Sequence, residues 1–363
     1  MKIKDIINEL ESFASLSLQE HWDNCGVQVG DTSLEATGIV LCLDVTLETV
    51  NKAIKKGFNL IISHHPLIFS GIKSLTGKNT TEKVMLSAIK NNLVIYSAHT
   101  NFDNAYGGVS FALAQKLGLK NISILVPSDE KLRKLAFFTP LSHIEQVQEA
   151  AFSAGAGRIG NYECCGFTSE GKGTFRALEG ANPYVGQFNK THTEEEVKFE
   201  TIVTLGKLNA VINAVKRVHP YEEVAFDLFE LQINRNDYGL GVVGEIEDTE
   251  FEDFAAHVKE SLDIPYVRYS KKTEKPIRRV AICGGSGAPF IKNAITSNAD
   301  IYLAGDFKYH DFQVPNDRIM IMDIGHFESE KFIIDIFYDI VTKKFSTFAD
   351  CIDIDNGSPV NYI

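Results

Sequence analysis

Short apolar segments alternate with helix-like segments over the first 125 residues, and this alternation restricts the fold more than any other feature of the chain. Helices are predicted where apolar residues recur every three to four positions, and strands where a short apolar run is bounded by turn residues. The predicted strands are GIVLCLDV (38–45), FNLIIS (58–63) and LVIYSA (93–98), and the predicted helices are 4–15, 47–56, 81–91 and 110–118. Elements of this length predict βαβ units around a mostly parallel sheet.

The same pattern returns from about residue 238 to the end of the chain. The predicted strands there are GVVGEI (241–246), RRVAICGG (278–285), ADIYLAGD (299–306) and RIMIMDIG (318–325), with helices between them and a last helix from about residue 328. We interpret residues 1–127 and 233–363 as the two halves of one metal-binding α/β domain.

Residues 128–232 show a different and self-contained order, βαββαβ. The predicted strands are 134–140, 162–171, 173–180 and 224–232, and the predicted helices are 143–155 and 209–218. This order is that of a ferredoxin-like domain, and domains whose ends lie close together are readily inserted into a loop. An inserted α+β domain is therefore expected between the two halves.

Composition and charge exclude several classes of function. The 363 residues are 44% apolar and 23% charged, and no apolar run approaches the roughly 18 residues that a membrane span needs. A formal charge of −12 without a basic cluster argues against nucleic-acid binding, although a small nucleotide stays possible. The six cysteines lack zinc-knuckle spacing, so reduced thiols and a cytoplasmic location are expected.

Two adjacent histidines, His64 and His65, follow a predicted strand directly and precede Pro66. Strands of open α/β sheets present functional side chains at their carboxyl ends. Successive side chains of an extended segment diverge, so two neighbouring histidines suit two different metal ions better than one. The alternative is a pair of hydrogen-bonded histidines that only completes the strand end.

A second group follows the next strand, where SAHTNFDNAYGG holds His99 and Asp103. Consecutive strands usually lie side by side, so this loop is expected to open beside the histidine pair. Asp103 is a candidate ligand, and a turn or helix cap is the competing interpretation. His99 is a candidate ligand, a partner behind the ligands or a carrier of protons, and we expect it to lie behind the ligands.

A third group lies in MDIGHFESEKFII, where His326 follows a strand and Glu330 comes four residues later. That spacing places both side chains on one face of a helix. Three imidazoles and two carboxylates suit zinc, manganese, iron, cobalt or nickel, and five ligands shared by two divalent ions leave positions open for chemistry. The prediction is a pair of divalent ions held by His64, His65, Asp103, His326 and Glu330, with His99 and Glu330 needed for catalysis.

Long segments of the chain resemble the Nif-three-like family, also called GTP cyclohydrolase type 2 homologues. The matching segments are WDNCGVQVG (22–30), LCLDVT (41–46), IISHHPLIFSG (61–71), AHTNFDNAYGGV (98–109), GHFESE (325–330) and, in the insert, 155–186 and 218–231. The insert is similar to the PII-like or CutA-like domain of the longer bacterial members. By resemblance, His64, His65, Asp103, His326 and Glu330 match the positions that bind two divalent metals, in a hexameric toroid built as a trimer of dimers.

Several other polar groups have two interpretations each. Asp23 and Asn24 line a cavity mouth or make a turn, and Asp44 is a candidate hydrogen-bond partner of a ligand histidine. Asp306 and His310 are expected in a cavity wall rather than as ligands, and GGSGAPF (284–290) cradles a phosphate or makes a tight turn. A polar set in the insert forms a small-anion pocket or lid, or fixes strand pairing and trimer contacts: Arg158, Tyr162, Arg176, Glu179, Asn182, His219 and Glu222.

Three functions fit these features. The leading hypothesis is a dinuclear metal-dependent hydrolase that acts on a nucleotide or related heterocycle, GTP among them. The second is a non-catalytic protein that handles or delivers metal, and the third is a hexameric assembly that is regulated by a small molecule bound to the insert.

Overall fold

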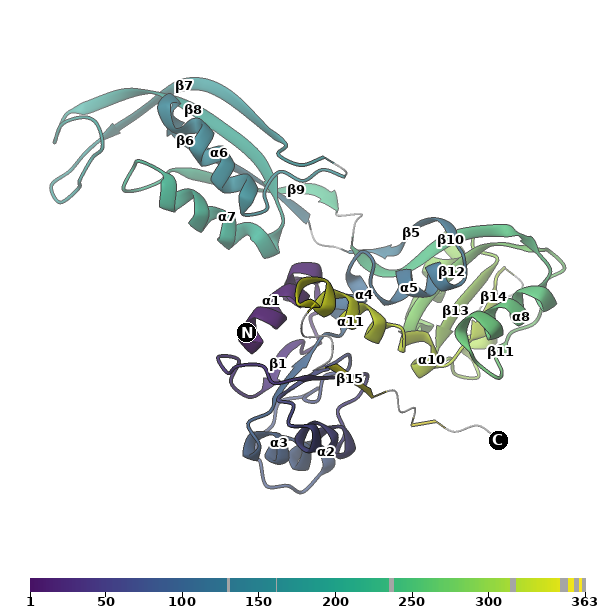
Figure 1. Cartoon of the computed structure of the whole chain (residues 1–363). Helices are drawn as coiled ribbons and strands as arrows, with labels where there is room; N and C mark the ends of the chain where they lie inside the picture. Colours follow the sequence, from purple (N-terminus) through teal and green to yellow (C-terminus); the bar gives the residue numbers. More distant parts are fainter. Residues whose placement is uncertain are drawn as a thin grey trace. The chain divides into compact units, whose positions relative to one another are not determined.

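The computed structural model of the chain divides into two units, a discontinuous one (1–128 and 236–363) and an inserted one (129–235) (Figure 1). The residues that it describes are 1–128, 131–160, 162–234, 238–313, 318–346, 352–355 and 359–360. No helix of this described part is long and apolar enough to cross a membrane.

The first sheet of the discontinuous unit explains the uninterrupted apolar strands of the sequence. Its order is β1 (Gly26–Val29), β4 (Val94–Ser97), β3 (Leu60–Ser63), β2 (Ile39–Cys42) and β15 (Ile352–Asp355), and only β1 is antiparallel to its neighbour. Helices α1 (Ile3–Phe13) and α11 (Ile333–Lys344) cover one face, and α2 (Leu47–Lys56) and α3 (Thr80–Lys90) cover the other (Figure 1). Because both faces are covered, every residue of β2, β3 and β4 is buried.

The second sheet of this unit is mixed rather than mostly parallel. Its order is β11 (Arg268–Tyr269), β14 (Met320–Asp323), β13 (Ile301–Gly305), β12 (Ile277–Ser286), β10 (Gly239–Thr249) and β5 (Lys120–Pro127). Only the pairs β12–β13 and β13–β14 are parallel. Helices α5 (Val109–Lys116) and α8 (Phe251–Leu262) pack on one face, and α9 (Ile291–Thr296) packs on the other.

The two sequence stretches exchange elements, so they do not coincide with the two sheets. Strand β5 belongs to the first stretch but pairs with β10 in the second sheet. Strand β15 and helix α11 belong to the second stretch but pack in the first sheet and its core. This exchange joins the two sheets into one unit.

The inserted unit has the predicted ferredoxin-like fold. Its antiparallel sheet has the order β7 (Gly166–Arg176), β8 (Thr191–Val203), β6 (Lys131–Pro140) and β9 (Phe226–Asn234), with α6 (Ile144–Ser153) and α7 (Leu205–Val218) packed on one face. The expected strand break near residue 172 is wrong, because Gly171 and Gly173 lie inside the continuous strand β7. Its partner β8 lies in a polar stretch where we predicted no strand, because the alternation of THTEEEVKFETIV is weak outside its last residues.

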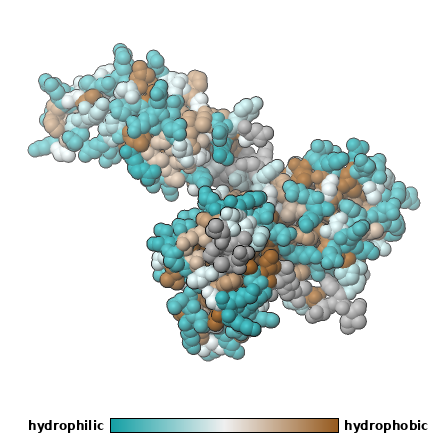
Figure 2. Space-filling view, viewed as in Figure 1, coloured by the Kyte–Doolittle hydropathy of each residue, from teal (hydrophilic) through white to brown (hydrophobic). Residues whose placement is uncertain are grey.

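Short helices complete the described fold. The α-helices α4 (Thr100–Asn104) and α10 (His326–Glu330) follow strands β4 and β14, and the 3-10 helices are Leu16–Leu18, Leu141–His143, Ala288–Phe290 and Asp311–Gln313. Most of the surface visible in Figure 2 is hydrophilic, and the apolar side chains form separate patches.

Candidate metal centre

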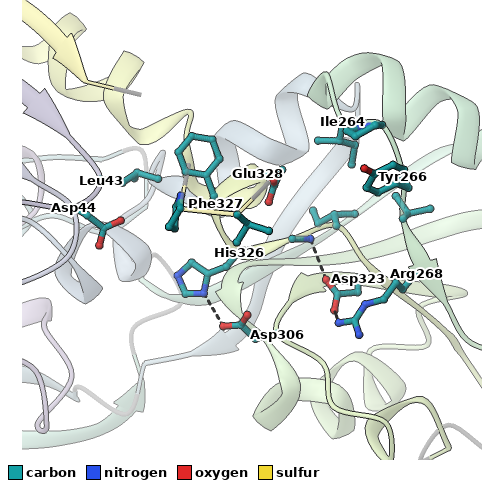
Figure 3. A pocket seen from close by; sticks show the side chains of 16 residues that line it. Leu43, Asp44, Ile264, Tyr266, Arg268, Asp306, Asp323, His326, Phe327 and Glu328 are labelled. Atoms are coloured by element: carbon teal, nitrogen blue, oxygen red, sulfur yellow. Dashed lines mark hydrogen bonds and ion pairs between the residues drawn. The ribbon is translucent and has the colours of Figure 1, made fainter. Parts of the chain in front are cut away.

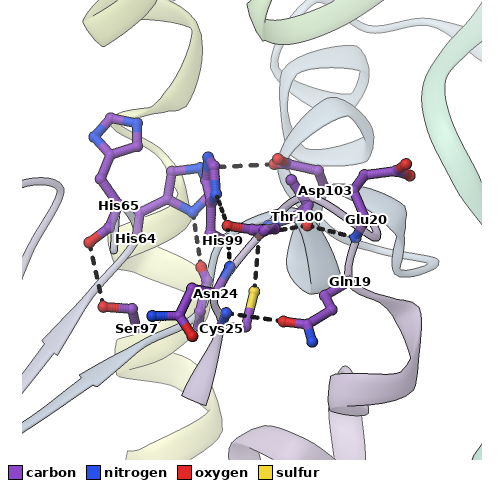
Figure 4. Close-up of polar contacts among 12 residues, drawn as sticks. Gln19, Glu20, Asn24, Cys25, His64, His65, Ser97, His99, Thr100 and Asp103 are labelled. Carbon is purple, nitrogen blue, oxygen red and sulfur yellow. Dashed lines mark hydrogen bonds and ion pairs between the residues drawn. The ribbon is translucent and has the colours of Figure 1, made fainter. Parts of the chain in front are cut away.

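The candidate ligands come from the carboxyl ends of three strands in the two sheets of the discontinuous unit. His64 and His65 directly follow β3. His99 directly precedes α4, and Asp103 lies in the first turn of that helix, after β4. Figure 4 labels both side chains. His326 begins α10, and Glu330 ends it one helical turn later, so both side chains lie on one face.

Four histidine rings are held in place through their Nδ1 atoms. Each Nδ1 lies within hydrogen-bond distance of an oxygen from a neighbouring loop. These contacts are His64 with the carbonyl oxygen of Ala98 (2.8 Å), His65 with Asp44 (3.0 Å), His99 with Asp23 (2.9 Å) and His326 with Asp306 (2.7 Å). A histidine that donates Nδ1–H to an oxygen keeps its Nε2 lone pair for a metal, and partners of this kind fix the ring orientation of metal ligands.

The Nε2 atoms of His64, His65 and His326 converge on the carboxylate of Glu330. Its Oε2 lies 3.0 Å from Nε2 of His65 and 3.0 Å from Nε2 of His326. Its Oε1 lies on the other side, 3.7 Å from Nε2 of His64, which is also 3.6 Å from Oδ1 of Asp103. One carboxylate therefore stands between two groups of ligand atoms.

Two buried atoms of this cluster fit a cation that lies between them. Nε2 of His64 and Oδ1 of Asp103 make no hydrogen bond within the part of the chain that the structure describes. His64 is 0% exposed, and leaving a buried polar atom unpaired costs about 1–3 kcal/mol. The two atoms face each other at 3.6 Å, so a divalent ion would satisfy both. The residues present thus fit a metal.

The electrostatics of the cluster point the same way. The hydrogen bond between His326 and Glu330 raises the pKa of His326 to about 9, although burial of the ring opposes this rise. Burial also opposes protonation of His65, but Asp44 and Glu330 outweigh it and raise its pKa to about 10. Burial would raise the pKa of Glu330, yet the three histidines around it hold that pKa well below its usual range. Protons on imidazoles thus supply the positive charge that a metal would otherwise bring.

His99 lies closer to the cluster than its sequence position suggests. Its ligand atom and those of His64 and His65 all lie within 4.8 Å of one another. Its ring stands edge-on to both neighbours, with centroids 5.2 and 5.5 Å away. His99 is therefore placed as a ligand would be, with its Nδ1 tied to Asp23.

The acidic partners of the histidines were only partly expected from the sequence. Asp44 lies where a hydrogen bond to a ligand histidine was predicted. Asp23 and Asp306 were placed only at the cavity mouth and wall, and the structure shows both bonded to a histidine of the cluster. Asp306 has a φ of 60°, a strained value for a residue other than glycine. An aspartate near the end of a strand, as in IYLAGD, was the available signal.

Gly285, near the end of β12, explains why the segment that leads to α9 is rich in glycine. A Cβ at this position would lie 2.1 Å from Oε1 of Glu330, and its φ is +64°. Its N–H donates to the hydroxyl of Ser329 (2.8 Å). The absence of a side chain at Gly285 therefore lets the backbone approach Glu330. His310 lies apart from it and is exposed, stacked edge-on against Tyr309.

Two surfaces adjoin the cluster. Trp22 lies 6.0 Å from His99 and 5.8 Å from Phe69, measured between ring centroids, and both aromatic side chains are about half exposed. On the other side a cavity of about 450 Å³ opens beside His326, lined mainly by apolar side chains (Figure 3). Arg268 in its wall forms an ion pair with Asp323, so its charge is already compensated.

An α/β fold with a histidine–carboxylate cluster at its strand ends defines a class of candidate metal-binding proteins, and the clusters of this chain could hold a metal ion. The family model described as Duf34/NIF3 (NGG1p interacting factor 3) matches residues 1–356. The chain therefore belongs to the Duf34/NIF3 family, which confirms the resemblance found in the sequence.

Curated relatives and a solved structure agree with this family assignment. A Halalkalibacterium halodurans protein named GTP cyclohydrolase 1 type 2 homolog is 41% identical over 327 residues, covering 88% of this chain and 87% of that protein. A Staphylococcus aureus (strain MSSA476) protein of the same name is 37% identical and covers all of both chains. The crystal structure of a Bacillus cereus protein related to NIF3 aligns with a TM-score of 0.86 and 36% identity, over 100% of this chain and 99% of that one.

Proposed function

We propose that this chain is a dinuclear metal-dependent hydrolase that acts on a nucleotide or a related heterocycle. The observation that carries the proposal is the two-sided position of Glu330. Its Oε1 faces His64, and its Oε2 faces His65 and His326. A carboxylate placed between two ligand groups suits two ions, because it reduces their mutual repulsion.

The two ligand groups divide as follows. His64, Asp103 and one oxygen of Glu330 would hold one ion, with His99 beside them. His65, His326 and the other oxygen of Glu330 would hold the second ion. When bound, a pair of divalent ions activates water and polarises the group that the water attacks. Zinc, iron, manganese, cobalt and nickel all suit these donors.

The side chains of the protein orient the site and move protons. Asp44 and Asp306 hold the Nδ1 atoms of His65 and His326, which aims both Nε2 atoms at Glu330. Burial opposes ionisation of Asp23, but hydrogen bonds from His99 and Thr100 lower its pKa, so it stays ionised. Nε2 of His99 can then accept a proton while Asp23 holds Nδ1–H and stabilises the imidazolium.

The substrate class is supported by the surface beside His99. The half-exposed rings of Trp22 and Phe69 offer apolar faces on which a planar heterocycle can stack. The names of the relatives, GTP cyclohydrolase 1 type 2 homolog, make GTP the first compound to test.

The test is turnover of GTP by metal-free protein that has been reloaded separately with zinc, manganese, iron(II) and cobalt. Glu330→Ala is expected to abolish product formation while the fold persists. His310→Ala is the matched control, because His310 lies near the strand ends but outside the cluster. Full turnover in Glu330→Ala would rule out the dinuclear mechanism, and no product with any metal would remove GTP as the substrate.

Metal handling without catalysis is the second candidate function. The observation that favours it is the partial exposure of His326, whose side chain is 35% accessible to solvent. A ligand at the surface allows a metal to be passed to an acceptor. Transfer of bound zinc to a chelating dye within minutes would support this function, whereas two ions that do not exchange would count against it.

Assembly remains a proposal taken from the family resemblance. The hexameric toroid, the trimer of dimers and a regulatory role of the insert are all predictions, as is the cytoplasmic location. Light scattering on the purified chain measures the oligomeric state directly. A monomer at micromolar concentration would contradict the hexamer.

A further inference from the structure

The inserted unit contains a cavity of about 440 Å³, and this cavity lies entirely within that unit. It is bounded by strand β7, the loop that follows it, one residue each of β6 and β8, and the segment after α7. Four aromatic residues line it, namely Phe138, Phe175, Tyr184 and Tyr221. We call this cavity the aromatic pocket.

Tyr221 is the fixed centre of the aromatic pocket. Its ring centroid lies 6.4 Å from Phe175 and 6.1 Å from Tyr184. Its backbone N–H donates to Nδ1 of His219 (3.1 Å), whose Nε2–H donates to the carbonyl oxygen of Phe138 (3.0 Å). Burial lowers the pKa of His219, so this ring is neutral and brings no positive charge to the pocket.

Three carboxylates also line the aromatic pocket. Glu196 accepts a hydrogen bond from the hydroxyl of Tyr221 (2.8 Å), and it leans over Gly173, where a Cβ would lie 2.0 Å from its Oε2. Glu222 accepts from the backbone N–H of Asn182 (2.8 Å) and ties the loop to the segment after α7. Glu223 also lines the pocket. Within the part of the chain that the structure describes, the partners of Glu196 and Glu222 are neutral groups.

The charge of the pocket selects its ligand. Among the described residues that line it, none is lysine, arginine or histidine. A small anion is therefore an unfavourable ligand for this pocket, because it would meet carboxylates without a counter-charge. A cation is attracted both by the carboxylates and by the negative faces of the aromatic rings.

We propose that the aromatic pocket binds a small organic cation of the methylated or quaternary ammonium class. The weakly hydrated charge of such a cation lies against the rings of Tyr184 and Tyr221, and the carboxylates of Glu196 and Glu223 face it. Its methyl groups fill the apolar remainder of the cavity. This site is separate from the metal centre and does not depend on the function proposed for it.

The test compares choline with 3,3-dimethylbutan-1-ol, its neutral analogue of nearly the same shape, by calorimetry on the full-length chain. Choline is expected to bind at least about tenfold more tightly than the alcohol. Tyr184→Ala and Glu196→Gln are each expected to weaken choline binding by about tenfold. Glu195→Gln is the matched control, because the neighbouring residue of a strand points to the opposite face.

Three outcomes would overturn the proposal. Equal binding of choline and the alcohol would show an apolar pocket without preference for charge. An equal loss in Glu195→Gln and Glu196→Gln would show only the general acidity of the strand. Absence of choline binding, together with a change in oligomeric state in Tyr184→Ala, would show that a second copy of the chain covers the pocket. Thermal unfolding of each variant confirms that the fold is retained.

Discussion

The candidate metal cluster and the aromatic pocket both gather carboxylates, but they balance the charge in different ways. The candidate metal cluster, called the metal cluster below, consists of His64, His65, Asp103, His326 and Glu330. In the metal cluster Glu330 is 3% exposed and surrounded by imidazoles that become positively charged by taking up protons. In the aromatic pocket Glu196 accepts from a tyrosine hydroxyl and Glu222 from a backbone amide. The first site must therefore exchange protons for its ligand, whereas the second can take up a cation without losing any proton.

Removal of Glu330 is expected to have the largest effect, because it should abolish tight metal binding at the cluster and leave cation binding at the aromatic pocket unchanged. Glu330→Ala takes away the carboxylate that both ligand groups share. Zinc affinity should therefore fall more than about 100-fold, and the number of bound ions per chain should fall from two to one or none. Elemental analysis after gel filtration, with calorimetry, measures both quantities. Choline binding to the aromatic pocket should be unchanged, and two tightly held ions in the variant would contradict the shared role of Glu330.

Asp306→Asn is expected to have a smaller effect on metal binding, and to affect only the ion beside His326. The substitution weakens the hydrogen bond that fixes Nδ1 of His326, so the ion beside His326 should bind about 10–100-fold more weakly. The ion beside His64 should be retained, since His64 is held by the carbonyl of Ala98. Stepwise zinc titration separates the two ions. Equal weakening of both would mean that they behave as one site.

The pH dependence of the two sites is expected to differ. His65 and His326 have pKa values of about 10 and 9 in the folded metal-free chain, above the usual 6.5. Their contribution to stability is therefore complete below pH 6.5 and is lost as the pH rises through 9 and 10. Metal must displace these protons, so zinc affinity should rise with pH over the same range.

Thermal unfolding of metal-free protein between pH 6 and pH 10 measures the first effect, and calorimetry measures the second. Choline affinity should change little from pH 6 to pH 8, because the groups that line the aromatic pocket are carboxylates and neutral side chains. His65→Gln removes one raised pKa and should flatten the loss of stability at high pH. A metal-free chain that becomes more stable toward pH 10 would contradict the charge balance described for the cluster.

The smallest expected effect concerns the aromatic surface beside the metal cluster. Trp22 is the single tryptophan of the chain, so its fluorescence reports on this surface alone. Guanosine should quench it, and Phe69→Ala should weaken that binding by about 0.5–1.5 kcal/mol, which is about two- to twelvefold. Ribose 5-phosphate is the control without a planar base. Equal quenching by both compounds would remove the argument for a heterocyclic substrate.

The sequence predicted those parts of the fold whose pattern is local. Strands β2, β3 and β4 were found because both of their faces are buried, and the helices around them because each has one apolar side. The pairings of β5 and β15 were missed, since they join segments far apart in the chain and depend on contacts that no local pattern records. Strand β10 was predicted at 241–246, but its antiparallel pairings with β12 and β5 were missed for the same reason.

For the candidate site, the sequence predicted which residues lie at strand ends but not all of the hydrogen bonds that join the loops. The ligand candidates stand at strand ends, which a sequence pattern locates, and the structure brings His64, His65, Asp103, His326 and Glu330 together. Their role as metal ligands remains a prediction. The bonds from Asp23 to His99 and from Asp306 to His326 were not predicted, because each joins two loops whose relative position depends on the packed sheets.

The pairing of β5 with β10 has a consequence for how this chain can change over time. Pro127 lies opposite Gly239 in the register, and beyond them the N–H of Ser128 donates to the carbonyl of Tyr238 (2.9 Å). The whole inserted unit thus occupies the place of a hairpin turn between two antiparallel strands. An insert of about a hundred residues and a turn of a few residues have the same effect on the second sheet. Either one connects β5 to β10 and allows the same antiparallel register between them. The insert can therefore be gained, lost or replaced in evolution without altering the strands that position the metal cluster.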